Sequence, residues 1–278
     1  MNYVCLLCLQ NKLTTSDLQF GFKKQLGCNH AIYTLRTLID YYVANNSTVY
    51  VCSLDLTKAF DKVDHSALFR KLMDKKVPGS IVKLLRDWLS KSFIRVKWEG
   101  CLSIRVQLFS GVRQGGILSP FFFACLVDDA LVKLSLSTLG CRLKGMLFNA
   151  IMYADDLLLL SLSVTDLQLM VNLCASEFAC IGLSINVKKS ACISIGVRHK
   201  LSPFKIRTDN ADIDWKQEIS FLGLTITASN TFKCNLQKIR HKFYRALSGL
   251  FGKIGLNSPT SVTLSLVNVN TFCLPILM

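Results

Sequence analysis

Residues 146–164 read MLFNAIMYADDLLLLSLSV, and the fold is decided by this stretch. Two apolar runs, residues 146–153 and 157–164, are separated only by a short acidic turn, which is the pattern of a β-hairpin. Asp155 and Asp156 lie at the tip of this predicted hairpin. Aspartates are also common in ordinary tight turns, because their side chains satisfy nearby backbone groups, so the pair alone does not define a site.

A third aspartate changes the interpretation of this pair. Asp55 directly follows an apolar run, residues 49–54, that predicts a second strand. If this strand and the hairpin share one sheet, all three carboxylates converge at one end of it. The alternative for Asp55 is a simple cap or turn at the end of a strand.

Converging carboxylates need a partner of opposite charge. On a half-buried sheet they repel one another and lose hydration, so they either take up protons or bind cations. Two Mg²⁺ ions about 4 Å apart, held by oxygen ligands, activate an attacking hydroxyl and stabilise a leaving oxygen in phosphoryl-transfer enzymes. The sequence therefore predicts a two-metal nucleotidyl transferase with Asp55, Asp155 and Asp156 as catalytic residues.

A glycine-rich segment supplies a candidate substrate cradle. Residues 110–116 read SGVRQGG, and glycines let a backbone approach a ligand closely. Gln114 offers amide groups to a base or sugar, and Arg113 offers a charge to a phosphate. Ser119, followed by Pro120, predicts the N-cap of an apolar helix. The segment is neither a P-loop nor a dinucleotide fingerprint, so an ordinary loop is the alternative.

The remaining patterns predict an α+β fold without internal repeats or low-complexity linkers. Asp64 is the predicted N-cap of one helix, and Asp128 and Asp129 are interpreted as the exposed edge of the apolar helix that follows Pro120. The predicted helices cover residues 31–44, 64–73, 80–89, 167–181 and 236–251, and the predicted strands cover 49–54, 94–98, 104–108 and 219–227.

Composition narrows the class of partner. The chain of 278 residues has a net charge of +15, and residues 188–253 hold 13 Lys or Arg against 4 Asp or Glu. Such a surface attracts polyanions, either nucleic acid or anionic membranes, although a generically basic protein is the alternative. Without an apolar run of about 18 residues or a secretory leader, the chain is expected to be soluble and intracellular. Its cysteines are interpreted as reduced, buried side chains.

Six sequence blocks follow one another in an order that resembles the reverse transcriptases of non-LTR (LINE-type) retrotransposons. They read QFGF at 19–22, SLDLTKAFDKV at 53–63, GVRQGGILSP at 111–120, YADD at 153–156, GLSINVKKS at 182–190 and FLG at 221–223. A single block would not be specific, but chance agreement of all six in order is very rare. The resemblance covers residues 19–225.

This resemblance implies a right-hand polymerase. The fingers are expected from residues 1–48 and 75–110, the palm, an antiparallel sheet with helices, from 49–74 and 111–228, and a partial, mostly helical thumb from 229–278. The implied activity is RNA-directed DNA synthesis, in which a dNMP is transferred to a primer 3′-hydroxyl on an RNA template. Non-LTR elements usually carry further domains, so the chain is expected to be a core or a fragment.

The resemblance also implies the metal site and the choice of sugar. Asp55, Asp155 and Asp156, with the backbone carbonyl of Leu56, are implied to hold two Mg²⁺ ions, with Mn²⁺ as an alternative. Phe60 is implied to lie under the incoming sugar and to reject a ribose 2′-hydroxyl, which favours dNTPs. The alternative for Phe60 is a core aromatic residue packed against the next helix.

The other implied contacts concern the nucleotide. They are Gln114 and Gly115 in the nucleotide and template pocket, Arg113 at a phosphate, Lys23 and Lys24 at the triphosphate, and Lys189 at the departing pyrophosphate. Members of the family often carry a Gly-Arg-Ser run after the two fingers lysines, where this chain has QLG at residues 25–27. The expected arginine is absent, so a surface role for both lysines is the alternative.

The implied partners are an RNA template, a DNA primer and dNTPs, without a membrane, and the implied location is the nucleus. An RNA-dependent RNA polymerase shares the palm chemistry, but Phe60 and the Tyr153-Ala154 dipeptide before the acids argue against it. A further alternative is an inactive relic that only binds nucleic acid through residues 188–253. The intact acids argue against the relic, and the truncated ends argue for it.

Overall fold

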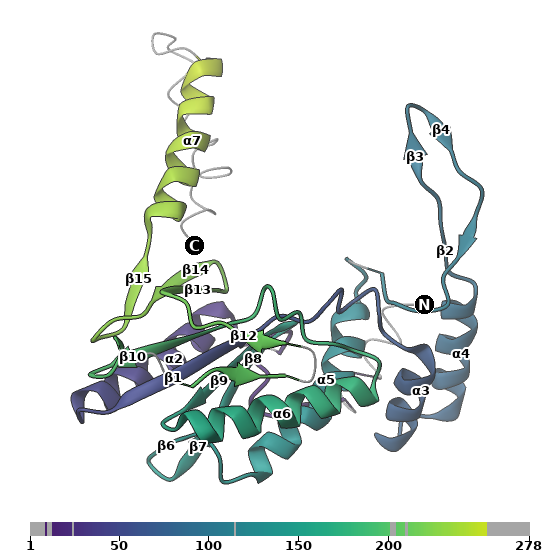
Figure 1. Ribbon diagram of the computed structural model, residues 1–278. Coiled ribbons are helices and arrows are strands. Elements are labelled where there is room, and N and C mark those ends of the chain that lie inside the picture. The colour runs from purple at the N-terminus through teal and green to yellow at the C-terminus, as the bar shows by residue number, and fades with distance from the viewer. Residues whose placement is uncertain are drawn as a thin grey trace.

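A four-stranded antiparallel sheet forms the centre of the protein (Figure 1). The computed structural model describes residues 9, 13–23, 25–113, 115–200, 204–208 and 211–254. The strands lie in the order β10, β1, β9 and β8, which span Ala191–Gly196, Thr48–Leu54, Asp156–Ser161 and Ala150–Tyr153. Because β1 pairs with β9, the predicted strand and the predicted hairpin share one sheet.

Both faces of this sheet are buried. Leu54 of β1 and Leu157 of β9 belong to a core cluster on the face covered by α5 and α6, whereas Val51 and Leu158 belong to a second cluster on the face covered by α2. These helices, α2, α5 and α6, span Cys28–Ala44, Ser119–Leu136 and Val164–Cys180. Two-sided burial explains why β9 reads as an unbroken leucine run rather than as an alternating strand.

Two further helices extend the core beside α5 (Figure 1). They are α3 and α4, which span His65–Asp74 and Gly79–Ser90. The carboxylate of Asp64 accepts hydrogen bonds from the backbone N–H groups of Ser66 at 3.0 Å and Ala67 at 3.2 Å. The predicted N-cap is therefore present, because these two N–H groups have no partner within the helix itself.

One interpretation of α5 was wrong. Asp128 is not on an exposed edge: its side chain is buried, with a residue exposure of 3%. Every residue from Phe122 to Asp128 is buried, so this half of the helix is enclosed on all sides. A helix that is apolar all round has no exposed stripe from which to locate its polar positions. Asp129, the next residue, is exposed as expected.

A two-stranded ribbon projects from the body next to α4 (Figure 1). Its strands β2, β3, β4 and β5 span Phe93–Ile94, Lys97–Trp98, Cys101–Leu102 and Val106–Gln107. The turn lies at Glu99 and Gly100, where both residues have positive φ, 45° and 83°. The predicted turn is confirmed, because two consecutive positive φ angles form the tight hairpin turn that matches strand twist. The predicted strands are shorter than expected: 94–98 is split between β2 and β3, and 104–108 keeps only β5.

Two predicted strands are interrupted in the structure. The run 146–153 divides into β7 and β8 at Asn149, whose buried amide nitrogen donates to the carbonyl groups of Leu134 at 2.6 Å and Leu139 at 3.1 Å. The run 219–227 folds back at Leu222 to form a hairpin. The strands concerned include β7, β13 and β14, which span Met146–Phe148, Glu218–Phe221 and Leu224–Thr227. Their pairing partners β6 and β15 span Cys141–Leu143 and Lys233–Asn235.

The described part of the chain ends in α7, Gln237–Ile254, which projects from the body after β15 (Figure 1). A small sheet formed by β11 and β12, Ile206–Arg207 and Asp212–Ile213, lies beside α6. The cysteines of the described residues are all free. Within the same residues, no helix combines the length and the apolar character that a membrane crossing requires.

Candidate active site

The strand register places Asp55 opposite Asp156. The last paired residues of β1 and β9 are Leu54 and Leu157, so the next antiparallel pair is Asp55 with Asp156. Side chains alternate along each strand, which puts both aspartates on the sheet face of Val51, the face covered by α2. The two carboxylates therefore share one end and one face of the sheet.

Asp155 is brought to the same place by a tight turn. Tyr153 pairs with Asp156, which leaves only Ala154 and Asp155 between β8 and β9. Ala154 has a φ of 59°, a left-handed conformation that glycine or asparagine adopts more easily. Such conformations persist only where the surroundings enforce them, and they cluster at functional sites.

The block at residues 182–190 supports Asp55 from its other side. The Asp55 N–H donates to the hydroxyl of Ser190 at 3.0 Å, and the Asp55 carbonyl accepts from the N–H of Asn186 at 2.8 Å. Leu56 bridges Ile185 in an antiparallel pair. In an extended strand the backbone groups of successive residues point to opposite sides, so the carbonyl of Leu56 points toward β9 and the acids.

The three carboxylates carry uncompensated charge. Burial, the carboxylate of Asp155 and the carboxylate of Asp55, in that order, raise the pKa of Asp156 to about 6. None of the ion pairs among the described residues involves these three side chains. Asp55 and Asp155 are half-buried, whereas Asp156 keeps solvent access.

The donor set fits a hard divalent cation in its chemistry, since it consists of carboxylate and carbonyl oxygens. Among the described residues, however, no group of three His, Cys, Asp or Glu side chains is placed to hold a metal ion together, and this includes the three aspartates. Asp55 and Asp156 thus form an acidic pair across two strands, and Asp155 lies in the adjacent turn.

The glycine-rich loop is docked on the chain that follows Asp55. The N–H of Gly111 donates to the carbonyl of Val63 at 2.8 Å, and its carbonyl lies 2.8 Å from Nε2 of His65. Gly111 has a φ of 85°, and an added Cβ would lie 2.7 Å from the carbonyl oxygen of Asp61. Only glycine fits this approach.

The predicted helix cap at Ser119 was wrong. The helix α5 begins at Ser119 itself, and the Ser119 hydroxyl donates back to the carbonyl of Arg113 at 2.6 Å. The hydroxyl therefore closes the glycine-rich loop instead of capping the helix. Arg113 and Gly115 are exposed on this loop, and Gln114 lies outside the described residues.

Phe60 packs on α5 and not on the helix that follows Asp64, and its contact with a sugar stays a prediction. Its ring stacks on Phe123 of α5 with centroids 5.0 Å apart and an interplanar angle of 29°. Its carbonyl accepts from the N–H of Val112 at 2.8 Å, which places it beside the glycine-rich loop. The residue is only half-buried, so one side of it remains available to a ligand.

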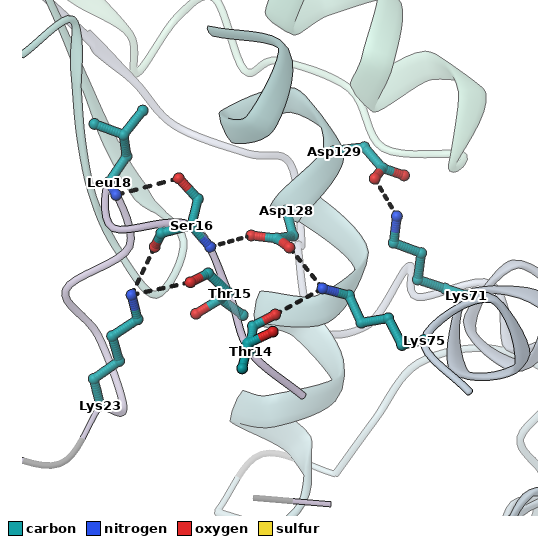
Figure 2. A network of polar contacts seen from close by, with 9 residues as sticks. All are labelled: Thr14, Thr15, Ser16, Leu18, Lys23, Lys71, Lys75, Asp128 and Asp129. Carbon is teal, nitrogen blue, oxygen red and sulfur yellow. Dashed lines mark hydrogen bonds and ion pairs between the residues drawn. The ribbon is translucent and has the colours of Figure 1, made fainter. Parts of the chain in front are cut away.

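The lysines differ in their relation to the acids. Nζ of Lys23 donates to the carbonyl groups of Thr15 at 3.2 Å and Ser16 at 2.7 Å, so it is held by the N-terminal segment (Figure 2). Lys24 lies outside the described residues. Lys189 is exposed and directly precedes Ser190, the residue that holds the N–H of Asp55. The nucleotide contacts of these lysines stay predictions.

Two residues of the site were missed from the sequence. The Ser190 hydroxyl holds the N–H of Asp55, and His65 holds the carbonyl of Gly111. Ser190 ends one of the six ordered blocks, directly before an apolar run that forms β10. That position was a usable signal, because a polar residue at a strand start can reach a neighbouring strand end. No local pattern indicated the partner of His65.

The charge of Asp156 gives a stability prediction for the metal-free protein. Because its pKa is raised from 3.8 to about 6, the folded state binds more protons than the unfolded state between these values. Stability should therefore fall as pH rises from about 4 to 6. We expect Asp156→Asn to stabilise the fold at pH 7.5 by about 1 kcal/mol after allowing for solvent access, or about 3 °C in melting temperature.

The measurement is thermal unfolding by circular dichroism with a chelator present, between pH 4 and 8. The advantage of the variant should shrink toward pH 4, where the carboxyl of the native protein is protonated. Asp87→Asn, which removes an exposed carboxylate of α4, is the matched control and should show no such trend. An unchanged or lower melting temperature for Asp156→Asn at pH 7.5 would contradict the predicted repulsion.

Comparison with known proteins identifies the family. A family model described as "Reverse transcriptase (RNA-dependent DNA polymerase)" matches residues 1–226. The Pol polyprotein of the retrotransposable element R2DM of Drosophila melanogaster is 24% identical over 253 residues, which are 84% of this chain and 23% of that protein. A Pol polyprotein of an R2 element of Popillia japonica is 33% identical over 203 residues, 67% of this chain and 28% of that protein.

A third relative is the RNA-directed DNA polymerase of the mobile element jockey of Drosophila funebris, 23% identical over 246 residues, 84% of this chain and 26% of that protein. The chain thus spans about a quarter of the length of these relatives.

Solved structures give the fold. An apo telomerase from Candida tropicalis, truncated from its C-terminal domain, aligns with a TM-score of 0.56 and 17% identity, covering 84% of this chain and 44% of that one. A telomerase from Candida albicans aligns with a TM-score of 0.57 and 15% identity, covering 99% and 47%. The predicted right-hand polymerase fold and the predicted resemblance to non-LTR retrotransposon polymerases are both confirmed. The chain belongs to the reverse transcriptase (RNA-dependent DNA polymerase) family.

Proposed function

We propose that this chain carries out RNA-directed DNA synthesis, the transfer of a dNMP to a primer 3′-hydroxyl opposite an RNA template. One observation supports this above the others: Asp55 and Asp156 face each other on one side of the sheet, with Asp155 in the turn between β8 and β9. Oxygen of the 3′-hydroxyl attacks the α-phosphorus, its proton leaves to solvent, and the bond to pyrophosphate breaks.

The residues that hold the metal follow from the same geometry. We propose that Asp55, Asp155, Asp156 and the carbonyl of Leu56 hold two Mg²⁺ ions, with Mn²⁺ as an alternative. Such ions lower the pKa of the attacking hydroxyl and neutralise the leaving oxygens. The chain itself orients the ligands: Ser190 and Asn186 fix the main chain of Asp55, and the turn fixes Asp155.

The exposed side of Phe60 supports the preference for dNTPs. Its ring is fixed from behind by Phe123, so it presents a rigid surface beside the glycine-rich loop. A rigid ring excludes a sugar substituent better than a mobile side chain, because it cannot give way without losing its own stacking. Gly115 and Arg113, both exposed on the loop, are the candidate contacts to the nucleotide.

The projecting ribbon supports RNA and DNA as partners. In residues 93–107, Arg95, Lys97 and Arg105 are all exposed, so three cations lie on the surface of one ribbon. The guanidinium of Arg105 lies over the ring of Phe93, 4.6 Å from its centroid. A row of cations on a narrow ribbon suits the phosphates of a nucleic-acid strand. We also propose the nucleus as the place of action, where chromosomal DNA is available as a primer.

Primer extension tests the proposed activity. With an RNA template, a DNA primer, dNTPs and Mg²⁺, the chain should extend the primer, and Asp155→Asn should reduce the rate by at least about a hundredfold, since one ligand of the metals is lost. Binding of the primer–template should persist in the variant. Equal extension by both proteins would refute the assignment of the acids, and binding without extension by either would favour the inactive relic.

Substitution of Phe60 tests the choice of sugar. Phe60→Val should raise rNTP incorporation relative to dNTP at least about tenfold, because space opens at the 2′-position. The measurement is the ratio of kcat/KM for the two nucleotides on one template. Phe123→Leu, which loosens the stack behind the ring, should raise the ratio by a smaller amount, because the ring stays in place but becomes less rigid. An unchanged ratio in Phe60→Val would make Phe60 a packing residue only.

The ribbon's charges lead to a prediction for the salt dependence of RNA binding. Replacing Arg95, Lys97 and Arg105 together by Gln should lower the slope of log Kd against log salt by about 2, at about 0.7 per lost phosphate contact. Fluorescence anisotropy with labelled single-stranded RNA measures this slope. The same three-charge change at Arg36 of α2, Arg142 of β6 and Lys144 of the turn after β6 should leave it almost unchanged. Equal slopes for both triple variants would remove the ribbon from the binding surface.

A further inference from the structure

A buried ion pair holds the N-terminal segment against two helices (Figure 2). Oδ2 of Asp128, in the middle of α5, lies 2.7 Å from Nζ of Lys75, and Oδ1 accepts a hydrogen bond from the N–H of Ser16 at 2.7 Å. Nζ of Lys75, at the end of α3, also donates to the carbonyl of Thr14 at 2.7 Å. Both charged groups thus form hydrogen bonds with backbone groups of residues 14–16.

The neighbouring ion pair shows that this arrangement is not needed to join the helices. Asp129 pairs with Lys71, and this pair links the same helices, α5 and α3, at the surface (Figure 2). Burying a charged pair costs desolvation free energy, and apolar residues of similar size usually stabilise a core at least as well. What Asp128 adds beyond Asp129 is its hold on the backbone of the N-terminal segment.

That segment continues directly to the hairpin that carries the acids. The carbonyl of Ser16 accepts from the N–H of Gln19 at 3.0 Å, so the chain turns there. The N–H of Met152 then donates to the carbonyl of Leu18 at 2.8 Å, and the N–H of Phe20 donates to the carbonyl of Met152 at 2.7 Å. Residues 18–20 therefore lie beside β8 as an extra sheet edge.

The contact ends at the acid turn itself. An added Cβ on Gly21 would lie 2.6 Å from the backbone nitrogen of Ala154, so Gly21 lies directly against this turn. The conformation of Gly21 is set by the fully buried Gln19, whose Oε1 accepts from the Gly21 N–H at 3.0 Å. Ala154 has its left-handed conformation just where this support touches it, one residue before Asp155.

We propose that Asp128 and Lys75 are positioning residues for Asp155 and Asp156. They fix residues 14–16, this segment fixes residues 18–21 as the neighbour of β8, and Gly21 holds the turn in the conformation that presents the two carboxylates. The inference deepens the proposed function and rests on it for its meaning, but the mechanical link can be measured without any activity.

Hydrogen exchange measures that link directly. In Asp128→Asn, the backbone amides of residues 150–157 should exchange faster, on the order of tenfold, because the support of the turn opens more often. The matched control is Asp129→Asn, which removes the neighbouring carboxylate of the same helix and should leave this segment as protected as in the unsubstituted chain. Equal acceleration in both variants would overturn the proposal.

Binding of Mg²⁺ supplies the second readout. Titration calorimetry with Mg²⁺ alone should show about tenfold weaker binding to Asp128→Asn, the usual size of effect when the support of a metal ligand is lost. Primer–template affinity should stay within about twofold, because the ribbon and the basic surface are untouched. Unchanged exchange and unchanged Mg²⁺ affinity, with only a lower melting temperature, would make the pair a stabilising contact and overturn the proposal.

A double substitution separates positioning from stability. Asp128→Leu with Lys75→Met replaces the buried pair by apolar side chains, which should keep the melting temperature near that of the unsubstituted chain. It still lacks the hydrogen bonds to Ser16 and Thr14, so exchange at residues 150–157 should remain fast and Mg²⁺ binding weak. If slow exchange at residues 150–157 and Mg²⁺ affinity were restored together with stability, the positioning role of Asp128 and Lys75 would be refuted.

A different result would refute the metal site of the proposed function. If the unsubstituted chain binds Mg²⁺ no better than Asp155→Asn does, the metal site is refuted, while the exchange result for Asp128→Asn still decides the positioning role.

Discussion

The register of β1 against β9 is the constraint on which the site depends. A slip of one residue would turn Asp55 to the opposite face of the sheet and away from Asp156. The apolar pattern alone does not prevent this, because both faces of these strands are buried and leucine suits either. At the strand ends, the two-residue turn at Ala154 sets β9 against β8, and the bonds from Asp55 to Ser190 and Asn186 hold the end of β1.

These fixed strand ends allow like charges to remain close. Burial, and after it the carboxylates of Asp155 and Asp55, raise the pKa of Asp156, so the charged form of this acid is unfavourable in the folded protein. An apolar core on both faces of the sheet offsets this cost, together with the cost of the left-handed Ala154. A cation bound here, as proposed above, would relieve the repulsion between the carboxylates.

Local patterns predicted the parts of this arrangement that are local. The hairpin of β8 and β9, the strand before Asp55, the cap at Asp64 and the ribbon turn all follow from runs of a few residues. The ordered blocks then identified which acids belong together. What could not be predicted are contacts between residues far apart in the chain.

Asp128 illustrates why such contacts escape the sequence. Its carboxylate accepts a hydrogen bond from the backbone N–H of Ser16, which is 112 residues earlier in the chain. The helix α5 also has no polar stripe that would show which side is exposed. The buried amide of Asn149 is similar, because an asparagine in an apolar run reads as an irregularity until the carbonyl groups that need it are known. In both cases a buried polar side chain serves backbone groups of another segment, which is the usual reason for burying one.

The helix α5 is a second connection between the glycine-rich loop and the acid turn, besides the docking of this loop on the chain that follows Asp55. Its first residue, Ser119, closes the glycine-rich loop, and Asp128, nine residues later and about 14 Å along the axis, holds the segment behind the acid turn. A buried helix transmits position with little loss, because its backbone is rigid and its side chains are close-packed. The spacing between the loop and the acids is therefore supported by a rigid structural element. In the proposed function, a substrate that bridged the loop and the acids would not need to create that spacing.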